Sequence, residues 1–163
     1  MPARTILGAL LLVLVAITPA VAGAYQNGMA ALAQQDYVAA ARIFGPLAQA
    51  GDPRAQAILG YLFANGRGVP QNYIESATWY RRASDQGDAN AQYMLGLMYD
   101  KGHGVPQNYV EAYKWLDLAV GRASGRTRDD WVRIRDAVAS KLSLVQITEG
   151  QRLALEWRPV RER

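Results

Sequence analysis

The chain has 163 residues; half are hydrophobic and a fifth are charged, a balance that excludes a disordered tail and a protein with several membrane spans. It has no cysteine and one histidine. These counts exclude disulfides, a cysteine nucleophile and thiolate metal sites, and they disfavour a histidine-rich metal centre. We therefore expect neither a metal nor a cofactor. Alanine is the most frequent residue, which favours packed helices over strands.

The beginning of the chain has the three parts of a secretory signal peptide. Arg4 supplies a positive start, residues 6–17 are an unbroken apolar run, and small residues follow Pro19. Two A-x-A sites predict removal of residues 1–24 or 1–22. The alternative is an uncleaved membrane anchor, but a span needs roughly 20 apolar residues and the proline interrupts this run. We expect a cleaved leader and a periplasmic or secreted chain.

The middle of the chain consists of two copies of a 36-residue unit. Residues 53–88 and 89–124 are identical at 14 of the 36 aligned positions. The densest match is the sequence G-x-G-V-P-Q-N-Y, which occupies 66–73 in the first copy and 102–109 in the second. Self-similarity of this period predicts a repeat architecture, in which each unit stacks on its neighbours to bury its apolar face.

Each copy predicts two helices. In the first helix an apolar residue recurs every four positions, which predicts a core stripe. The stripe consists of Ala55, Leu59 and Phe63 in the first copy and of Ala91, Leu95 and Tyr99 in the second. Gly60 and Gly96 lie within these helices, where we expect them to let the paired helix approach closely. We expect Trp79 and Trp115 of the second helices to lie inside the stack.

Between the two helices of each copy, glycine and proline predict a tight loop. We expect positive φ at the loop glycines, which are Gly66, Gly68, Gly102 and Gly104. Asn72 and Asn108 each precede a second helix and have a glutamate three positions later, which predicts N-terminal caps. His103 takes the place that Arg67 has in the first copy, so we interpret it as an exposed, tolerant loop position and not as a general base.

These motifs resemble the Sel-one-like repeat, a 36-residue relative of the tetratricopeptide repeat. The resemblance rests on A-Q-x-x-L-G, on the loop sequence and on the tryptophan that follows, and it covers residues 53–124. Residues 25–52 resemble a shorter leading unit without the loop, and residues 125–157 resemble the C-terminal capping hairpin of small exported members, with Ser143 as a cap and Gln146 at the third helical position. The resemblance implies an all-α fold, a short right-handed α-solenoid of helix hairpins with about eight helices after the signal peptide.

The C-terminal quarter carries the excess of positive charge. Residues 121–163 hold 10 basic and 6 acidic side chains, a net of +4, whereas residues 25–120 hold 7 and 8, a net of −1. We interpret these charges as the solvated face of an amphipathic helix that closes the end of the stack, followed by a basic tail at 158–163. The tail would permit weak contact with an anionic membrane surface, and for an exported chain we expect no nucleic acid. Asp129 and Asp130 are expected where the helix starts.

Residue patterns for catalysis are sparse. The loop glycines lack the Lys-Ser/Thr pair of a phosphate-binding loop, and no serine has a lysine three residues on. Asp88 and Asp100 bracket one predicted helix and could flank a groove, but a glycosidase needs two carboxylates that face each other at a defined separation. No residue is therefore predicted to be catalytic.

Three classes of function remain. The resemblance implies a non-enzymatic protein–protein interaction module, an adaptor or regulator in the bacterial cell envelope. The alternatives are a hydrolase directed at cell-wall material or a β-lactam, and a structural subunit of an envelope assembly. Relatives linked to the hydrolase activity are rich in cysteine, and this chain has none. We favour the interaction module, with a protein or peptide partner.

A partner-binding face is predicted on the first helices of the two copies, which line the concave side in tetratricopeptide-like stacks. Beside each core stripe lies a second set of positions on the same helix. The residues at these positions differ between the two copies, whereas the core stripe and the loop recur in both. Variation of this kind beside a constant scaffold is typical of a recognition surface. The predicted partner-binding residues are Arg54, Tyr61, Asn65, Asn90, Tyr93, Leu97 and Lys101. The alternative is that Tyr61, Tyr93 and Leu97 pack between repeats.

Overall fold

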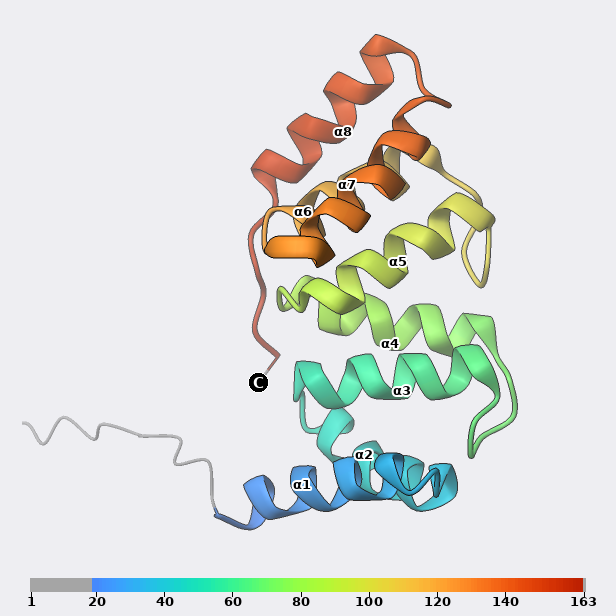
Figure 1. Ribbon diagram of the computed structural model, residues 1–163, viewed down its shortest axis with the longest axis vertical. Helices are drawn as coiled ribbons and strands as arrows, with labels where there is room; N and C mark the ends of the chain where they lie inside the picture. The colour runs from blue at the N-terminus through green and yellow to red at the C-terminus, as the bar shows by residue number, and fades with distance from the viewer. Residues whose placement is uncertain (1–18, 163) are drawn as a thin grey trace, which may run out of the picture.

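The computed structural model describes residues 19–162 and is a stack of helices (Figure 1). The helices are α1 (Pro19–Ala33), α2 (Tyr37–Gln49), α3 (Pro53–Asn65), α4 (Tyr73–Asp85), α5 (Ala89–Lys101), α6 (Tyr109–Val120), α7 (Gly125–Ala139) and α8 (Leu144–Glu156). The first six pair in chain order, and each pair packs on the next. With eight helices and no strand among the described residues, the expected all-α solenoid of helical hairpins is confirmed.

The predicted leader overlaps the start of the stack. Its first part, residues 1–18, lies outside the described residues, and residues 19–24 form the beginning of α1. The side chain of Tyr25, the first residue after the predicted leader, packs edge-on against the buried ring of Phe44, with ring centroids 5.5 Å apart. The packing of α1 on α2 therefore includes residues that follow both predicted cleavage sites.

The buried stripe of each first helix differs from the predicted one at its last residue. Ala55 and Leu59 are buried as predicted, but the next buried apolar residue is Leu62, and Phe63 is only half-buried. The second copy likewise buries Met98 in place of Tyr99. Two turns of α-helix take about 7.2 residues, so position i+7 stays on the buried face while position i+8 rotates away from it.

Glycines inside the first helices let the second helices pack closely, as predicted. A Cβ atom at Gly60 would lie 2.8 Å from the ring of Tyr80, and one at Gly96 would lie 2.7 Å from Leu116. Tyr80 and Leu116 occupy the same position in the two copies. Each hairpin therefore closes around the same small residue, although the side chain opposite it differs.

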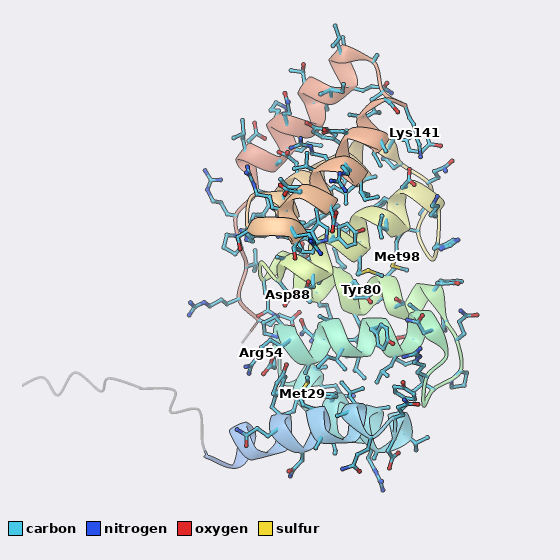
Figure 2. All side chains as sticks on the ribbon, viewed as in Figure 1. Met29, Arg54, Tyr80, Asp88, Met98 and Lys141 are labelled. Atoms are coloured by element: carbon cyan, nitrogen blue, oxygen red, sulfur yellow. The ribbon has the colours of Figure 1, made fainter. Side chains whose placement is uncertain are left out.

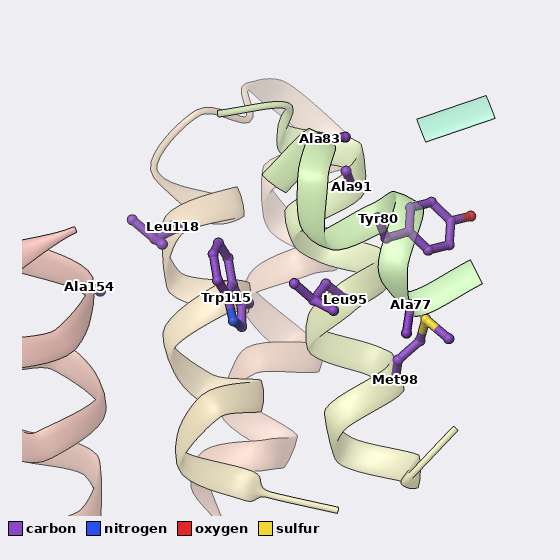
Figure 3. Packing of buried hydrophobic residues seen from close by; sticks show 9 residues of the cluster. All are labelled: Ala77, Tyr80, Ala83, Ala91, Leu95, Met98, Trp115, Leu118 and Ala154. Carbon is purple, nitrogen blue, oxygen red and sulfur yellow. The ribbon is translucent and has the colours of Figure 1, made fainter. Parts of the chain in front are cut away.

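The two repeat tryptophans lie in different environments. Trp115 is 1% exposed and packs in the core among Leu95 and Leu118, as predicted (Figure 3). Trp79 is only half-buried, so the prediction is wrong for this residue. The difference arises because Trp157, at the end of α8, packs edge-on against Trp115, whereas the guanidinium of Arg82 lies over the Trp79 ring, 4.7 Å from its centroid.

The loops have the predicted conformations. All four loop glycines have positive φ, and the side chains of Asn72 and Asn108 accept hydrogen bonds from the first turns of α4 and α6. His103 is exposed, as expected, and stacks on Tyr73 with ring centroids 4.7 Å apart. Arg67 lies in the same way over Tyr37, one repeat earlier.

Because Arg67 shows that arginine fits this stacking position, we expect His103→Arg to be neutral. The free energy of unfolding should change by less than about 0.5 kcal/mol, as for most surface substitutions. Urea unfolding followed by circular dichroism measures this. A larger loss would mean that the imidazole has a role besides stacking.

The last two helices close the stack by packing on α6. Val138 of α7 is buried against Tyr113 and Leu116, and α8 contacts α6 through the buried Ala154 and Gly150. The predicted capping box at the start of α8 is present, with reciprocal hydrogen bonds between Ser143 and Gln146. The prediction for Asp129 and Asp130 is wrong: α7 begins at Gly125, so neither carboxylate lies in its first turn, and Asp130 pairs with Arg133.

The segment after α8 turns back along the stack instead of leaving it. Residues 157–162, which we call the C-terminal strap, run in extended form beside the helix ends to the level of α3 and α4 (Figure 1). The backbone N–H of Val160 donates a hydrogen bond to the Asp85 carbonyl oxygen at 2.8 Å. The sequence indicated only a basic tail here, so this long-range contact is a finding of the structure.

Candidate partner-binding cleft

A cleft of about 530 Å³ lies where the first helices of three successive hairpins meet. Its walls are apolar and aromatic, with Tyr25, Met29 and Leu32 from α1, Ile58 and Tyr61 from α3, and Met94 from α5. Figure 2 shows Met29 of α1, Arg54 of α3 and Tyr80 of α4, three of the residues that line the cleft. An apolar hollow with a few polar groups is the usual form of a binding site.

A phenol group forms part of the cleft. Tyr80 of α4 is 3% exposed, and its hydroxyl has no hydrogen-bond partner among residues 19–162. Figure 3 shows this hydroxyl pointing away from the core cluster to which the ring belongs. Burial raises the pKa of Tyr80, so the group stays protonated and is a hydrogen-bond donor. Leu116 occupies the same position in the next repeat, so the hydroxyl is particular to this level of the stack.

A carboxylate without a cationic partner also lines the cleft. Asp88 caps α5 by accepting a hydrogen bond from the Ala91 N–H at 2.8 Å, and burial raises the pKa of this carboxyl group. At the matching place in the first copy, Asp52 pairs with Arg54 at 2.9 Å. Asn90 stands where that arginine would be, and within the described part of the chain no cation pairs with Asp88. The cleft therefore favours a cationic group in a ligand.

Five of the seven predicted partner-binding residues line this region. Arg54, Tyr61 and Asn90 line the cleft itself. Leu97 and Lys101 line an adjoining cavity of about 220 Å³. The two hollows share Tyr80 and Met94, so they form one continuous surface along α3, α4 and α5.

The other two predicted residues lie outside both hollows. Tyr93 is half-buried and stacks on Trp131 of α7, with ring centroids 4.8 Å apart and planes 11° from parallel. Asn65 is exposed at the end of α3, and its amide donates to the Tyr61 carbonyl oxygen at 2.8 Å. For Tyr93 the structure therefore matches the alternative reading, packing within the stack.

Sequence reasoning missed the contributions of α1 and α4. Tyr25, Met29 and Leu32 recur at i, i+4 and i+7, the spacing of one helix face, and that period was available in the sequence. The position of Tyr80 was also visible, since a tyrosine replaces the apolar residue of the other repeat. That both sets meet in one cleft depends on how three hairpins stack.

The carboxylates that bracket α5 do not form a catalytic pair. Asp88 and Asp100 stand at opposite ends of a helix, where twelve steps of about 1.5 Å place them roughly 18 Å apart. Asp100 is buried and pairs with Lys141 at 2.5 Å. A retaining or inverting glycosidase needs carboxylates within about 10 Å of each other. Among the described residues there is also no group of three or more potential metal ligands.

Stacked helical hairpins, with an apolar cleft between the first helices of the hairpins, are the architecture of an interaction scaffold. Comparison with known proteins identifies the family. The profile described as Sel1 repeat matches residues 53–88 and 89–120. A Sel1 repeat protein from Oxalobacter formigenes is 33% identical in sequence with a TM-score of 0.60; the match covers 69% of this chain and 87% of that one. This chain belongs to the Sel1 repeat family, whose members are generally protein–protein interaction modules.

A second solved structure has the same fold over more of the chain. It is c5321, described as a protective antigen present in uropathogenic Escherichia coli strains and displaying an SLR fold. It is 27% identical with a TM-score of 0.76, and the match covers 83% of this chain but only 29% of that protein. The comparison with curated proteins gives no match. In residues 19–162 no helix combines the length and apolar character that crossing a membrane requires.

Proposed function

We propose that this chain is a non-enzymatic adaptor or regulator of the cell envelope that binds an extended segment of a partner protein in the cleft between α1, α3 and α5. The observation that carries the proposal is the cleft itself. Aromatic and methionine side chains form its walls, and two polar groups face it. The Tyr80 hydroxyl has no hydrogen-bond partner among the described residues, and the Asp88 carboxylate, which caps α5, has no cationic partner there. A ligand that supplies an acceptor to the hydroxyl and a cation to the carboxylate would therefore gain hydrogen bonds and charge pairing in the cleft.

The charges of the cleft indicate the chemistry of the bound segment. The guanidinium of Arg54 already pairs with Asp52 and lies 4.3 Å from the centre of the Tyr25 ring, so it has little capacity for an acidic ligand. Asp88 has no such partner among the described residues. A lysine or arginine of the partner would pair with Asp88 while its aliphatic stem lies on Tyr61 and Met94. Methionine walls adapt to differently shaped ligands.

Export is part of the proposal and rests on the sequence of the predicted leader. Both predicted cuts, after residue 22 and after residue 24, precede every residue that lines the cleft. A mature chain would therefore keep the whole site, with its new amino group on Gly23 or on Tyr25. Intact-mass measurement of the exported protein tests this, and a full-length chain retained in the membrane would contradict it. Weak contact of the exposed Arg158 and Arg161 with anionic lipid remains a prediction.

The partner is identified by photo-crosslinking from the cleft. A benzophenone amino acid replaces Ile58, which lines the cleft, or Glu75, which is exposed on α4 away from it. Both proteins are irradiated in an envelope extract, and crosslinked products are identified by mass. We expect a defined partner from position 58 that is absent from position 75. Equal products from both positions would move the site off this face.

Substitutions then test the captured partner. We expect Tyr61→Ala to weaken binding by roughly 30-fold, the effect of truncating an aromatic anchor. Asp88→Asn should weaken it by about tenfold, because asparagine still caps α5 but carries no charge. Asn65→Ala is the matched control on α3 and should stay within about twofold. Isothermal titration calorimetry gives the affinities, and circular dichroism checks folding. Unchanged affinity for folded Tyr61→Ala and Asp88→Asn would overturn the cleft as the binding site.

A further inference from the structure

The edge of the stack where the C-terminal strap lies contains a carboxylate-binding site. One edge of the Arg82 guanidinium faces Glu162 and donates to both of its oxygens, with Nε 2.9 Å from Oε1 and Nη2 2.5 Å from Oε2. The Gln56 amide nitrogen lies 2.8 Å from the same Oε2. Gln56 is fully buried, so an inaccessible polar group of α3 points at this carboxylate. The arginine beside Glu162 holds the pKa of that carboxyl group below its ordinary value.

The donors of this site are positioned without help from the strap. The Gln56 side chain donates to the Ala48 carbonyl oxygen and accepts a hydrogen bond from Gln86. Gln86 in turn donates to the Gly51 carbonyl oxygen. The guanidinium of Arg82 lies on the Trp79 ring. A site whose groups are held by the repeats themselves is preorganised for a carboxylate from any source that fits.

The strap itself is held by few contacts. Its residues 158–161 are all exposed, and the side chain of Val160 is 66% exposed. Beyond the hydrogen bond from Arg158 to the nearby Leu155 carbonyl oxygen at the end of α8, its hydrogen bonds to the stack within the described chain are those of the Val160 N–H and of the Glu162 carboxylate. A segment anchored at two points with a solvated backbone opens at low free-energy cost.

The site is particular to one level of the stack. In the next repeat Gln92 corresponds to Gln56 and is equally buried, but Leu118 replaces the arginine and Arg122 replaces Gln86. No carboxylate reaches Gln92 from the described residues, and its side-chain oxygen has no hydrogen-bond partner there. The arrangement of Gln56 and Arg82 is therefore not a general property of the two copies.

We propose that the edge formed by Gln56, Arg82 and the Asp85 carbonyl is a second peptide-binding site, specific for an extended segment with a glutamate, which the C-terminal strap occupies in cis. The ligand places a backbone N–H on the Asp85 carbonyl oxygen and, two residues later, a glutamate on Arg82 and Gln56. None of the residues that line the cleft takes part in these contacts. The second site is thus independent of the proposed function of the cleft.

Tethering determines when such a ligand binds. A segment joined to the stack through Trp157 is present at an effective concentration in the millimolar range, so it outcompetes a free peptide of equal intrinsic affinity. A partner displaces the wild-type strap only by binding more tightly than the strap does. In a variant whose strap lacks the glutamate, the site is open to a free peptide. Replacing Glu162 by lysine places a positive charge against Arg82 and so vacates the site.

The test is a titration of the full-length chain with the peptide acetyl-Arg-Pro-Val-Arg-Glu-amide, which has the sequence of the strap. NMR chemical shifts of the Gly51, Arg82 and Gly87 amides report occupancy. We expect the peptide to bind Glu162→Lys at least about tenfold more tightly than the wild type, whose site is filled. The matched peptide that ends in glutamine should bind Glu162→Lys about tenfold more weakly, because it lacks the charge-assisted bonds.

A double variant decides the role of the arginine. Arg82→Gln combined with Glu162→Lys should lose the preference for glutamate over glutamine. Peptide binding to Glu162→Lys that does not distinguish glutamate from glutamine, or shifts that stay absent at several millimolar peptide, would overturn the proposal. The first result would mean that the glutamate does not determine recognition, and the second that the strap makes an intramolecular contact only.

Discussion

Gly104→Ala is expected to lower the free energy of unfolding by about 3 kcal/mol or more, whereas Gly102→Ala, two residues away, should cost about 1–2 kcal/mol. The two glycines have the same φ of +70°, so the strain of a left-handed alanine is common to both. They differ in what a Cβ atom would meet. At Gly104 it would lie 2.0 Å from the Tyr73 carbonyl oxygen, and at Gly102 its nearest neighbour would be the Gln107 Cβ at 3.4 Å.

The clash at Gly104 falls on backbone and not on a movable side chain, so it cannot be relieved by a rotamer change. Because Tyr73 begins α4 of the preceding repeat, the loop must separate from its neighbour to accept the methyl group. Urea unfolding followed by circular dichroism gives both values. Equal losses for the two variants would show that the conformation of the loop, and not its contact with α4, requires the second glycine.

The repeats and their hairpins could be predicted because each depends on residues near one another in the sequence. The 36-residue period, the caps at Asn72 and Asn108 and the small residues at Gly60 and Gly96 all act within one hairpin or between adjacent ones. Stacking such units is the way repeat proteins bury a core. The number of hairpins and the C-terminal capping hairpin were predicted from the resemblance to a known repeat, and not from the residue pattern alone.

The candidate sites could be predicted only in part because they depend on packing between distant segments. Arg54 and Tyr61 were accessible to sequence reasoning, since each lies on a helix face whose neighbours are set by the repeat. Whether Tyr93 is free to bind a partner depends on its stacking with Trp131, which belongs to α7 and not to a repeat copy. The contact of Glu162 with Gln56 joins residues 106 positions apart, and no local pattern indicates it.

Contacts with distant segments also predict different roles for the two tryptophans that occupy equivalent repeat positions. Trp115→Ala should lower the free energy of unfolding by about 3–5 kcal/mol, the range for removing a fully buried aromatic side chain. Its ring joins α5, α6 and α8, since it packs with Leu95, Leu118 and Trp157. Losing it opens a cavity at the place where the last helix meets the repeats.

Trp79→Ala should cost about 1–2 kcal/mol, because the ring is only half-buried and less apolar surface is lost. Its distinctive effect should fall on the strap, since the ring supports the Arg82 guanidinium that holds Glu162. Hydrogen exchange at the Val160 amide should therefore quicken in Trp79→Ala by more than the loss of global stability explains. In Trp115→Ala the same amide should quicken only in step with global unfolding. Equal behaviour of the two variants would show that Trp79 serves the core alone and that Arg82 is held in place by other contacts.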